Sequence, residues 1–273
     1  MKRFILVVLI FGMLSVICWA SGLQVIAHRG FSSVAPENTM AAFRAAAELG
    51  VAFELDVTLT ADGEVVVIHD DTLGRTTNGR GDVSNVSLAE IKQLDAGSWF
   101  GAEFAGEKIP TLREVLEHFG GVVPIDIEIK DRKPHEPLAD AVVAEIERLG
   151  LADKVFITAF NPYMLVRARE KNPELRRGML TGTFKDEDLN PLEKFVLRRL
   201  LFQWKIKPHY IAIEDVRVNR RNVRRWQRRG YAVLVWTVND EAEMRRMIEL
   251  GVDGIITDYP DRLLKLLGKQ NEN

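Results

Sequence analysis

Cysteine is almost missing from this 273-residue chain, because Cys18 is its only cysteine. A single thiol excludes an internal disulfide and a zinc site built from several cysteines. Cys18 also lies inside an N-terminal apolar segment, so a chain that lost this segment would have no cysteine nucleophile. A lipoprotein would carry its lipid on such a cysteine, but Ile17 is bulky where a small residue is needed, and we do not favour that interpretation.

Motifs that mark several large enzyme classes are missing as well. The sequence contains no G-x-S-x-G, no P-loop and no G-x-G-x-x-G, which argues against a serine hydrolase of the α/β type, a P-loop NTPase and a dinucleotide-binding enzyme. A large excess of charge of one sign is also lacking, since the formal net charge is -2 and the pI is near 6.3. The chain has no general attraction to nucleic acid, and we predict no nucleic-acid partner.

The first twenty residues differ from the rest of the chain. Lys2 and Arg3 precede an apolar run, Phe4–Ala20, that only Gly12 and Ser15 interrupt. This pattern predicts a signal peptide cleaved after Ala20. An uncleaved membrane anchor is the alternative, because about 17 apolar residues are enough to span a bilayer. Either interpretation places the rest of the chain outside the cytoplasm. We therefore divide the chain into a signal peptide or membrane anchor (1–20) and one barrel domain (23–268).

Short β-branched runs alternate with amphipathic stretches after residue 22, and this alternation is typical of parallel strands joined by helices. A (β/α)8 TIM barrel needs about 250 residues and eight strands, and both numbers fit this sequence. The eight predicted strands are Gln24–His28, Ala52–Val57, Val122–Lys130, Val155–Phe160, Arg177–Thr181, Tyr210–Glu214, Ala232–Val238 and Gly254–Asp258.

A ninth run, Val65–His69, breaks the alternation because only a short connection, Thr60–Glu64 with Asp62-Gly63 at its centre, precedes it after the second strand. Such a short connection predicts a β-hairpin, which would place His69 opposite Leu55. A small insertion then follows the second strand over Asp71–Thr111, with a helical piece near Leu88–Leu94. Long insertions at the carboxyl ends of barrel strands usually serve the active site.

Three acidic residues lie in two of the predicted strands. Glu54 and Asp56 are two positions apart, so their side chains point to the same face, and Glu128 lies in the third strand. Two carboxylates on one face repel each other unless a cation or a proton lies between them. An all-oxygen site of this kind suits Mg2+ or Ca2+. Surface acids paired with arginines are the ordinary alternative, but these acids lie in apolar strands beside a histidine.

Further polar residues occupy the predicted ends of strands. His28 and His69 each end an apolar run, and a convergent pair of histidines suits general acid and base catalysis. Arg29 and Lys130 lie beside these acids and histidines in sequence and would add positive charge for a phosphoryl group. Trp236 is a candidate wall of the substrate pocket, although an aromatic residue in the core would give the same pattern.

Seven strings of this sequence resemble, in order and spacing, the glycerophosphodiester phosphodiesterase family over roughly residues 24–265. They are IAHRG, APENT, FELDVTLTADGEVVVIHDDTLGRTTNG, IPTLREVL, IEIK, VWTVND and GVDGIITDYP. The resemblance implies a distorted (β/α)8 barrel and hydrolysis of glycerophosphodiesters to glycerol 3-phosphate and an alcohol, with Ca2+ or Mg2+. It also implies roles for single residues: Glu54, Asp56 and Glu128 as metal ligands, His28 as base, His69 as acid, and Arg29 and Lys130 as phosphate contacts.

Two other functions stay open at this point. A lysophospholipase D acting on membrane lysolipids is one, because the interruption Gly182–His209 contains a predicted amphipathic helix, Pro191–Lys205, with apolar and basic residues suited to a membrane surface. The stretch Arg217–Arg229, with seven arginines, could add positive charge, but a barrel helix with a solvated basic side is the simpler interpretation. A non-catalytic barrel that binds a phosphate ligand or a partner protein is the other, although a binder has no need for both histidines.

Overall fold

The computed structural model describes residues 22–130, 136–184 and 190–268. The predicted signal peptide or anchor over residues 1–20 lies outside the described residues. In the described ranges, no helix combines the length and the apolar character that crossing a membrane requires.

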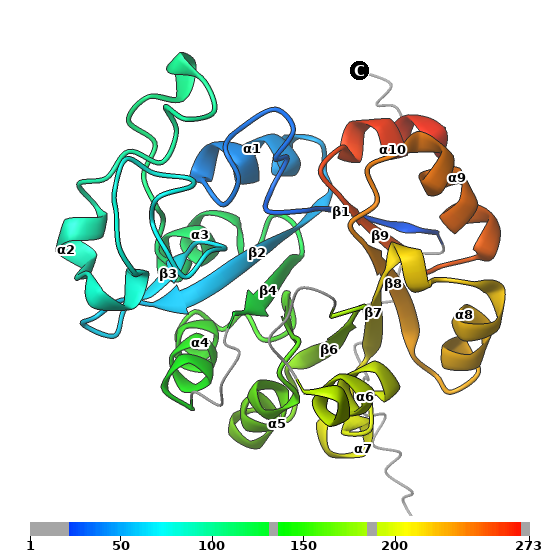
Figure 1. The fold of residues 1–273 in the computed structure, drawn as a ribbon. Helices are drawn as coiled ribbons and strands as arrows, with labels where there is room; N and C mark the ends of the chain where they lie inside the picture. Colours follow the sequence, from blue (N-terminus) through cyan, green and yellow to red (C-terminus); the bar gives the residue numbers. More distant parts are fainter. Residues whose placement is uncertain (1–21, 131–135, 185–189, 269–273) are drawn as a thin grey trace, which may run out of the picture.

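Eight parallel strands form a closed barrel within the described residues (Figure 1). The neighbours follow the order β1, β9, β8, β7, β6, β5, β4, β2, and pairing of Ile26 with Ala52 joins β1 to β2 and closes the ring. The predicted TIM barrel is confirmed, and the predicted strands match to within a few residues at their ends. The strands are β1 (Gln24–Ala27), β2 (Ala52–Leu59), β4 (Ile125–Ile129), β5 (Val155–Ala159), β6 (Arg176–Thr181), β7 (Tyr210–Glu214), β8 (Ala232–Trp236) and β9 (Gly254–Thr257).

The predicted hairpin and insertion are also present. Strand β3 (Val65–Val67) runs antiparallel to β2, and the pairing of Val57 with Val67 has the register that places His69 level with Leu55. The insertion that follows contains the short helices η1 (Val83–Asn85), α2 (Leu88–Ile91) and η2 (Ala102–Phe104). It has a small core of its own, formed by Val66, Ile68, Leu73, Val83, Ile91, Ala96 and Ile109.

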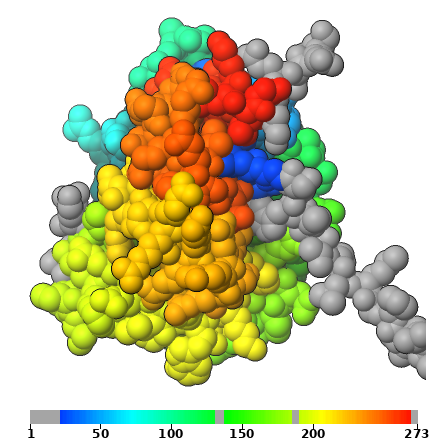
Figure 2. Space-filling view, turned by 90° about the vertical axis from the view of Figure 1, so that its right-hand side faces the viewer, coloured from blue at the N-terminus to red at the C-terminus, as the bar shows by residue number. Residues whose placement is uncertain are grey.

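Helices cover the outside of the barrel, and local capping explains where several begin. Thr39 caps the helix predicted after it, and Asn190 and Asp240 accept hydrogen bonds from the first turns of two others. Figure 2 shows one flank, which the segments α8 to α10 (yellow to red) cover. The helices are α1 (Met40–Glu48), α3 (Leu112–Phe119), α4 (Glu136–Arg148), α5 (Pro162–Lys171), α6 (Pro191–Arg199), α7 (Gln203–Ile206), α8 (Arg220–Gln227), α9 (Glu241–Leu250) and α10 (Pro260–Leu266).

Two predicted helices have other bounds in the structure. The single helix predicted over Pro191–Lys205 is wrong, because the chain forms α6 and α7 instead. Leu200 between them has a left-handed backbone (φ 53°, ψ 44°) and is buried, so the first helix ends where this side chain turns into the core. The stretch Arg217–Arg229 is helical only over α8.

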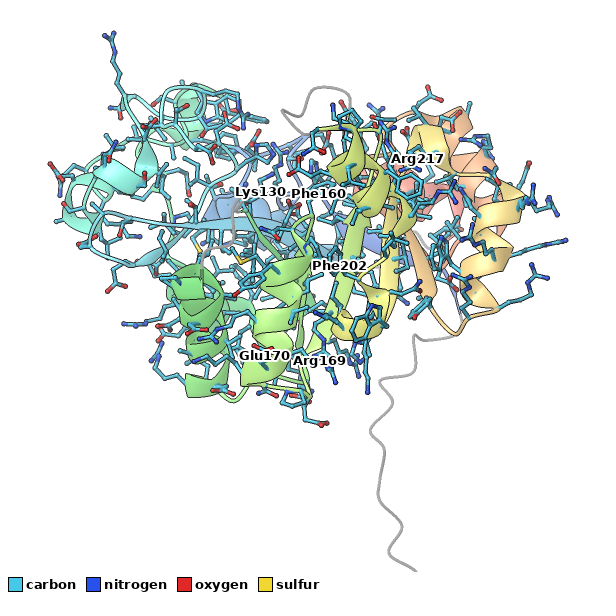
Figure 3. The ribbon with its side chains drawn as sticks, turned by 60° about the horizontal axis from the view of Figure 1, so that its bottom comes forward. Lys130, Phe160, Arg169, Glu170, Phe202 and Arg217 are labelled. Atoms are coloured by element: carbon cyan, nitrogen blue, oxygen red, sulfur yellow. The ribbon has the colours of Figure 1, made fainter. Side chains whose placement is uncertain are left out.

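Alternation along the strands separates two apolar layers. On β2, Phe53 and Leu55 point outward to the helices, and Glu54 and Asp56 point into the barrel. The barrel interior below the acids is filled by Ile26, Leu180, Tyr210, Ala212, Leu234 and Ile256. Figure 3 shows the two ends of the barrel: Lys130, Phe160 and Arg217, which follow strands, lie at one end, and Arg169 and Glu170 lie at the other.

The interior has no room for one more methyl group at Gly178. A Cβ atom there would lie 2.2 Å from Cε2 of Tyr210 and 2.8 Å from Cγ2 of Thr158, and the Tyr210 side chain is among the largest that are fully buried. We predict that Gly178→Ala lowers the free energy of unfolding by about 1–3 kcal/mol, measured by urea denaturation. Gly121→Ala is the control, since its Cβ would meet nothing within 4 Å. An equal effect of both substitutions would contradict this account.

Candidate functional site

Acidic side chains gather inside the barrel because β2 and β4 are adjacent and in register. Asp56 pairs with Glu128, and Glu54 pairs with Asp126. Glu54 and Asp56 are buried, and Glu128 is half-buried. One carboxylate oxygen from each of Glu54, Asp56 and Glu128 lies within 4.8 Å of the others. The three predicted metal ligands are therefore brought together.

The fourth acid, Asp126, lies beside this cluster and is differently partnered. Its carboxylate accepts hydrogen bonds from the Thr158 hydroxyl and from the Tyr210 hydroxyl, each at 2.8 Å. Burial raises the pKa of Asp126 to about 6, and the two hydroxyl groups limit the rise. Asp126 is thus committed to the barrel interior and does not belong to the group of three.

The hairpin brings His69 to the acids from one side. Its Nδ1 atom lies 2.6 Å from Oδ1 of Asp70, and Nζ of Lys130 donates to its Nε2 atom at 3.0 Å. The same Lys130 nitrogen lies 3.4 Å from Oε1 of Glu128 and 3.8 Å from Oδ1 of Asp56. Lys130 therefore stands between the predicted acid and two of the predicted metal ligands.

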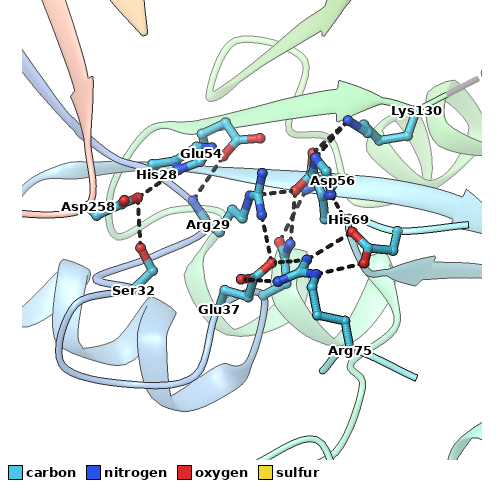
Figure 4. A network of polar contacts seen from close by, with 12 residues as sticks. His28, Arg29, Ser32, Glu37, Glu54, Asp56, His69, Arg75, Lys130 and Asp258 are labelled. Atoms are coloured by element: carbon cyan, nitrogen blue, oxygen red, sulfur yellow. Dashed lines mark hydrogen bonds and ion pairs between the residues drawn. The ribbon is translucent and has the colours of Figure 1, made fainter. Parts of the chain in front are cut away.

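His28 lies on the opposite side of the cluster, since β2 separates β1 from β3. In Figure 4, Glu54 and Asp56 lie between the two histidines. The Nδ1 atom of His28 is 2.7 Å from Oδ1 of Asp258, which follows β9. Asp258 also accepts from Ser32 at 3.0 Å and from the Asn239 amide at 2.6 Å. Since Nδ1–H donates to this fixed carboxylate, the Nε2 atom of His28 is left to face the site.

The turn after β1 aims Arg29 at the carboxylates. Arg29 has a left-handed backbone (φ 56°), and its own N–H donates to Oε2 of Glu54 at 2.9 Å. Its side-chain Nε lies 3.4 Å from Oδ2 of Asp56. Gly30 is required next, because φ is +80° and a Cβ there would lie 2.7 Å from the backbone of Ala42. The H-R-G sequence thus sets a tight turn that presents a cation to two acids.

A chain of ion pairs links Arg29 to His69 at the hairpin (Figure 4). Arg75 donates to both oxygens of Glu37 at 2.8 Å and to both oxygens of Asp70 at 2.6 and 2.9 Å. Glu37 also accepts from Arg29 at 2.7 Å, and Asp70 holds His69. Arg75 is therefore a bidentate clamp that fixes Arg29 and His69 relative to each other.

The buried acids do not share their negative charge equally. Burial and the neighbouring Asp56 and Glu128 raise the pKa of Glu54 well above its usual range. Burial also raises the pKa of Glu128 to about 7, although Lys130 opposes the rise. Burial acts in the same direction on Asp56, but Lys130 and Arg29 outweigh it and leave the pKa of Asp56 below its usual value. Without an additional cation, the cluster therefore holds protons on part of its carboxylates near neutral pH.

Burial also controls His69. It lowers the pKa of His69, the Asp56 carboxylate opposes this, and Lys130 and Arg29 add to the lowering. His69 is accordingly neutral at pH 7 in this arrangement, with its proton on the nitrogen that faces Asp70. Lys130 keeps its charge, because Glu128 and Asp56 raise its pKa against the effect of burial.

The three acids fit a divalent cation on two grounds. Oε1 of Glu54 is buried and has no hydrogen-bond partner, which is costly for a carboxylate oxygen unless a cation or proton is near it. The donor set is entirely oxygen, which suits hard cations such as Mg2+ and Ca2+.

Aromatic residues form a further wall at the same end of the barrel. Trp236 ends β8 and packs edge-on against Phe160 at 5.4 Å between ring centroids, and Phe160 in turn contacts Phe184 at 5.8 Å. The indole Nε1 of Trp236 is buried without a hydrogen-bond partner. Trp236 is also packed against the interior apolar layer, so it contributes to the core as well as to this wall.

Several partners of the site were not predicted from the sequence. Asp258, Asp70, Glu37 and Arg75 hold the histidines and Arg29, yet the sequence assigned a role to none of them. One signal was available: Asp258 ends the eighth predicted strand, as His28 ends the first. Asn239, which follows β8, holds Asp258 through its side-chain amide.

Comparisons with known proteins agree with one another. The profile of the Glycerophosphoryl diester phosphodiesterase family matches residues 28–262. A glycerophosphodiester phosphodiesterase of Caldanaerobacter subterraneus subsp. tengcongensis is 42% identical over 250 residues, which cover 90% of this chain and 98% of that protein. One from Bacillus subtilis is 33% identical over 261 residues, covering 88% and 85%.

Solved structures match the fold as well. A phosphodiesterase of Oleispira antarctica, solved in complex with the product sn-glycerol-3-phosphate, is similar with a TM-score of 0.79 and 33% identity, covering 90% of this chain and 96% of that one. A glycerophosphodiester phosphodiesterase of Agrobacterium tumefaciens is similar with a TM-score of 0.73 and 34% identity, covering 89% and 100%.

The pairing of His28 with Asp258 predicts the position of a proton. In the native chain, neutral His28 should carry its proton on Nδ1, since Asp258 can only accept. In Asp258→Asn, the new amide can donate to Nδ1 and shift the proton to Nε2, the nitrogen that would otherwise be free to act as base. Nitrogen-15 NMR of the imidazole rings would measure this change, with His118 on α3 as the control. An unchanged His28 tautomer in the variant would contradict the assignment.

Proposed function

The chain belongs to the glycerophosphodiester phosphodiesterase family and is a phosphoric diester hydrolase, and we propose that it hydrolyses its substrates by acid–base catalysis between His28 and His69 beside a divalent metal ion. The products would be glycerol 3-phosphate and an alcohol. The observation that carries the proposal is the cluster of Glu54, Asp56 and Glu128, with one histidine on each side of it.

Glu54, Asp56 and Glu128 would hold the metal ion. When bound, a Mg2+ or Ca2+ ion would act as a Lewis acid that stabilises the negative charge of the reacting phosphoryl group. The unpartnered oxygen of Glu54 and the raised pKa of Glu128 support this proposal, because both describe carboxylates that lack sufficient positive charge.

Arg29 and Lys130 would bind the phosphodiester. Both cations now contact the acids, with Arg29 Nε at 3.4 Å from Asp56 and Lys130 Nζ at 3.4 Å from Glu128. A phosphate group at the mouth offers oxygen acceptors that suit both side chains. Lys130 would then leave Nε2 of His69 free to face the substrate.

The two histidines are proposed to act in turn. His28, with Nδ1 held by Asp258, would take the proton from the substrate hydroxyl that is vicinal to the phosphoester, and this hydroxyl would attack phosphorus. His69 would protonate the departing alcohol, and water would then open the cyclic phosphate with the roles reversed. Because burial and Lys130 keep His69 neutral in the free site, the negative charge of the bound phosphodiester is what would allow it to take up a proton.

The other two interpretations of the sequence are less favoured. A non-catalytic barrel would not need two histidines and their carboxylate partners around three acids, and the relatives are named as phosphodiesterases. A lysophospholipase D would use the same site and differs in its substrate, whose glycerol carries an acyl chain. We further propose an extracytoplasmic location for the enzyme, on the basis of the apolar run Phe4–Ala20.

Metal dependence has a pH signature. Because Glu54 and Glu128 must lose protons to bind the ion, and the pKa of Glu128 is raised to about 7, metal affinity should fall as the pH drops below about 7, by up to about tenfold per pH unit for each proton released. We predict that release of glycerol 3-phosphate from glycerophosphocholine stops with chelator and that half-activation needs more Mg2+ or Ca2+ at pH 6 than at pH 8. Activity that persists after complete chelation would exclude the metal.

The two histidines can be told apart by the leaving group. His69→Ala should lower turnover of glycerophosphocholine by about 100-fold or more, because choline is a poor leaving group that needs the proton. The same variant should lose far less activity on glycerophospho-p-nitrophenol, whose leaving group departs without protonation. His28→Ala is the matched control, and it should lose activity equally on both substrates. The reverse pattern would exchange the two roles, and full activity of His69→Ala would end the proposal.

A further inference from the structure

An unusual share of exposed apolar surface lies on α6 and α7. In the described ranges, ten large hydrophobic residues are exposed, and five of them lie between residues 192 and 204. We call these five the α6–α7 patch: Leu192 (70% exposed), Phe195 (49%), Leu201 (48%), Phe202 (37%) and Trp204 (68%).

Folding does not require this patch. Helix α6 has no buried residue, and the segment is attached to the barrel by Leu200 and Ile206, which are 2% and 0% exposed. The five residues belong to none of the buried apolar clusters and leave 37% to 70% of their surface exposed to water. Clustered apolar groups of this kind mark an interaction site, whereas single exposed ones do not.

The chemistry around the patch is basic. Residues 191–207 contain Lys194, Arg198, Arg199, Lys205 and Lys207 against one acid, Glu193, although the whole chain has a net charge of -2. Two of these cations lie over rings of the patch: Arg199 over Phe195 at 5.1 Å and Lys205 over Trp204 at 5.2 Å. Rings and cations are thus presented together on one exposed segment.

The patch begins next to the mouth of the barrel. Arg198 donates to the carbonyl of Thr183, and the Thr181 hydroxyl donates to the carbonyl of Leu197 at 3.4 Å. Thr181 ends β6 and Thr183 follows it, so both lie at the catalytic end of the barrel. Figure 3 places Phe202 on the flank, between the end that carries Lys130 and the end that carries Arg169. The patch therefore extends from the rim of the site down one side of the molecule.

We propose that the α6–α7 patch docks the enzyme onto an anionic lipid–water interface, with Phe195, Phe202 and Trp204 among the acyl chains and the basic residues at the headgroups. Exposed aromatic and aliphatic groups bordered by lysine and arginine suit this boundary. A second copy of the chain would be a poor partner for the α6–α7 patch, because a symmetric contact would bring five basic residues of one copy against the same five of the other.

The docking itself goes beyond the proposed hydrolysis, and only its consequence for substrates rests on that proposal. A rim held at the lipid surface would give the site direct access to glycerophosphodiesters that carry an acyl chain. Soluble glycerophosphodiesters would reach the same site without the patch.

Trp204 can report the contact directly. The full chain is mixed with vesicles of phosphatidylcholine and 30% phosphatidylglycerol that carry brominated acyl chains, and tryptophan quenching is measured. We expect Trp204→Phe to remove most of the quenchable emission and Trp99→Phe, which removes a tryptophan that is 43% exposed in the insertion, to remove little. Trp19 lies in the predicted signal peptide or anchor and would be quenched if that segment entered the bilayer, so all variants are compared in a Trp19→Phe background.

Quenching that is the same in the native chain and in Trp204→Phe would overturn the proposal. So would quenching of equal strength on vesicles of phosphatidylcholine alone, since the basic residues would then play no part. Self-association that depends on Trp204 without quenching would assign the patch to a second copy instead.

A second experiment measures the consequence for substrates. The double variant Leu192→Ser, Phe195→Ser should lower hydrolysis of a glycerophosphodiester lysolipid in anionic vesicles by about tenfold, with glycerophosphocholine hydrolysis unchanged. Val122→Ser is the matched control, since Val122 is 64% exposed far along the chain from the patch. Equal loss of activity on both substrates in the double variant would count against docking. If the native chain hydrolysed neither substrate, the proposed function would be refuted, and the quenching experiment alone would decide whether the patch docks.

Discussion

The central constraint on this structure is the repulsion between four carboxylates, which two adjacent strands direct into the barrel and which their neighbours must offset. Asp56 lies opposite Glu128, and Glu54 lies opposite Asp126, and like charges at such positions destabilise a sheet. An apolar layer fills the interior below them, so water cannot screen the charges. The fold offsets the repulsion in two ways: hydroxyl groups hold Asp126, and Arg29 and Lys130 lie beside Asp56 and Glu128.

Each loop around the cluster supplies part of this positive charge. The tight turn after β1 presents Arg29, the end of β4 presents Lys130, and the insertion presents Arg75, which holds Arg29 and His69 through Glu37 and Asp70. Cations that neutralise the acids in the free site are also the groups suited to a phosphate. The same side chains therefore stabilise the fold and are available to the substrate, which explains why they lie at strand ends rather than inside the core.

Sequence patterns were sufficient for the parts of the site that arise from local geometry. The spacing of Glu54 and Asp56 predicts one face of a strand, and the short Asp62-Gly63 connection predicts a hairpin whose register the structure confirms. Partners that depend on distant contacts were missed. Asp258 meets His28 across 230 positions, and Arg75 meets Glu37 across 38, so no local period could reveal either pair. The break at Leu200 was missed for the same reason, because tertiary burial of one leucine overrides a helical pattern.

The raised pKa values connect the site to the stability of the barrel. Burial favours the protonated forms of Glu54 and Glu128, so both contribute stability that is present below their ordinary pKa values and is lost as the pH rises through the raised ones, about 7 for Glu128. At neutral pH and above, the cation-free barrel therefore carries a destabilised acidic cluster beside a tightly packed interior. A divalent ion held by the three acids would remove that cost by binding only the folded arrangement. The charge that makes the site suited to a metal would thus also make the folded barrel gain stability from binding one.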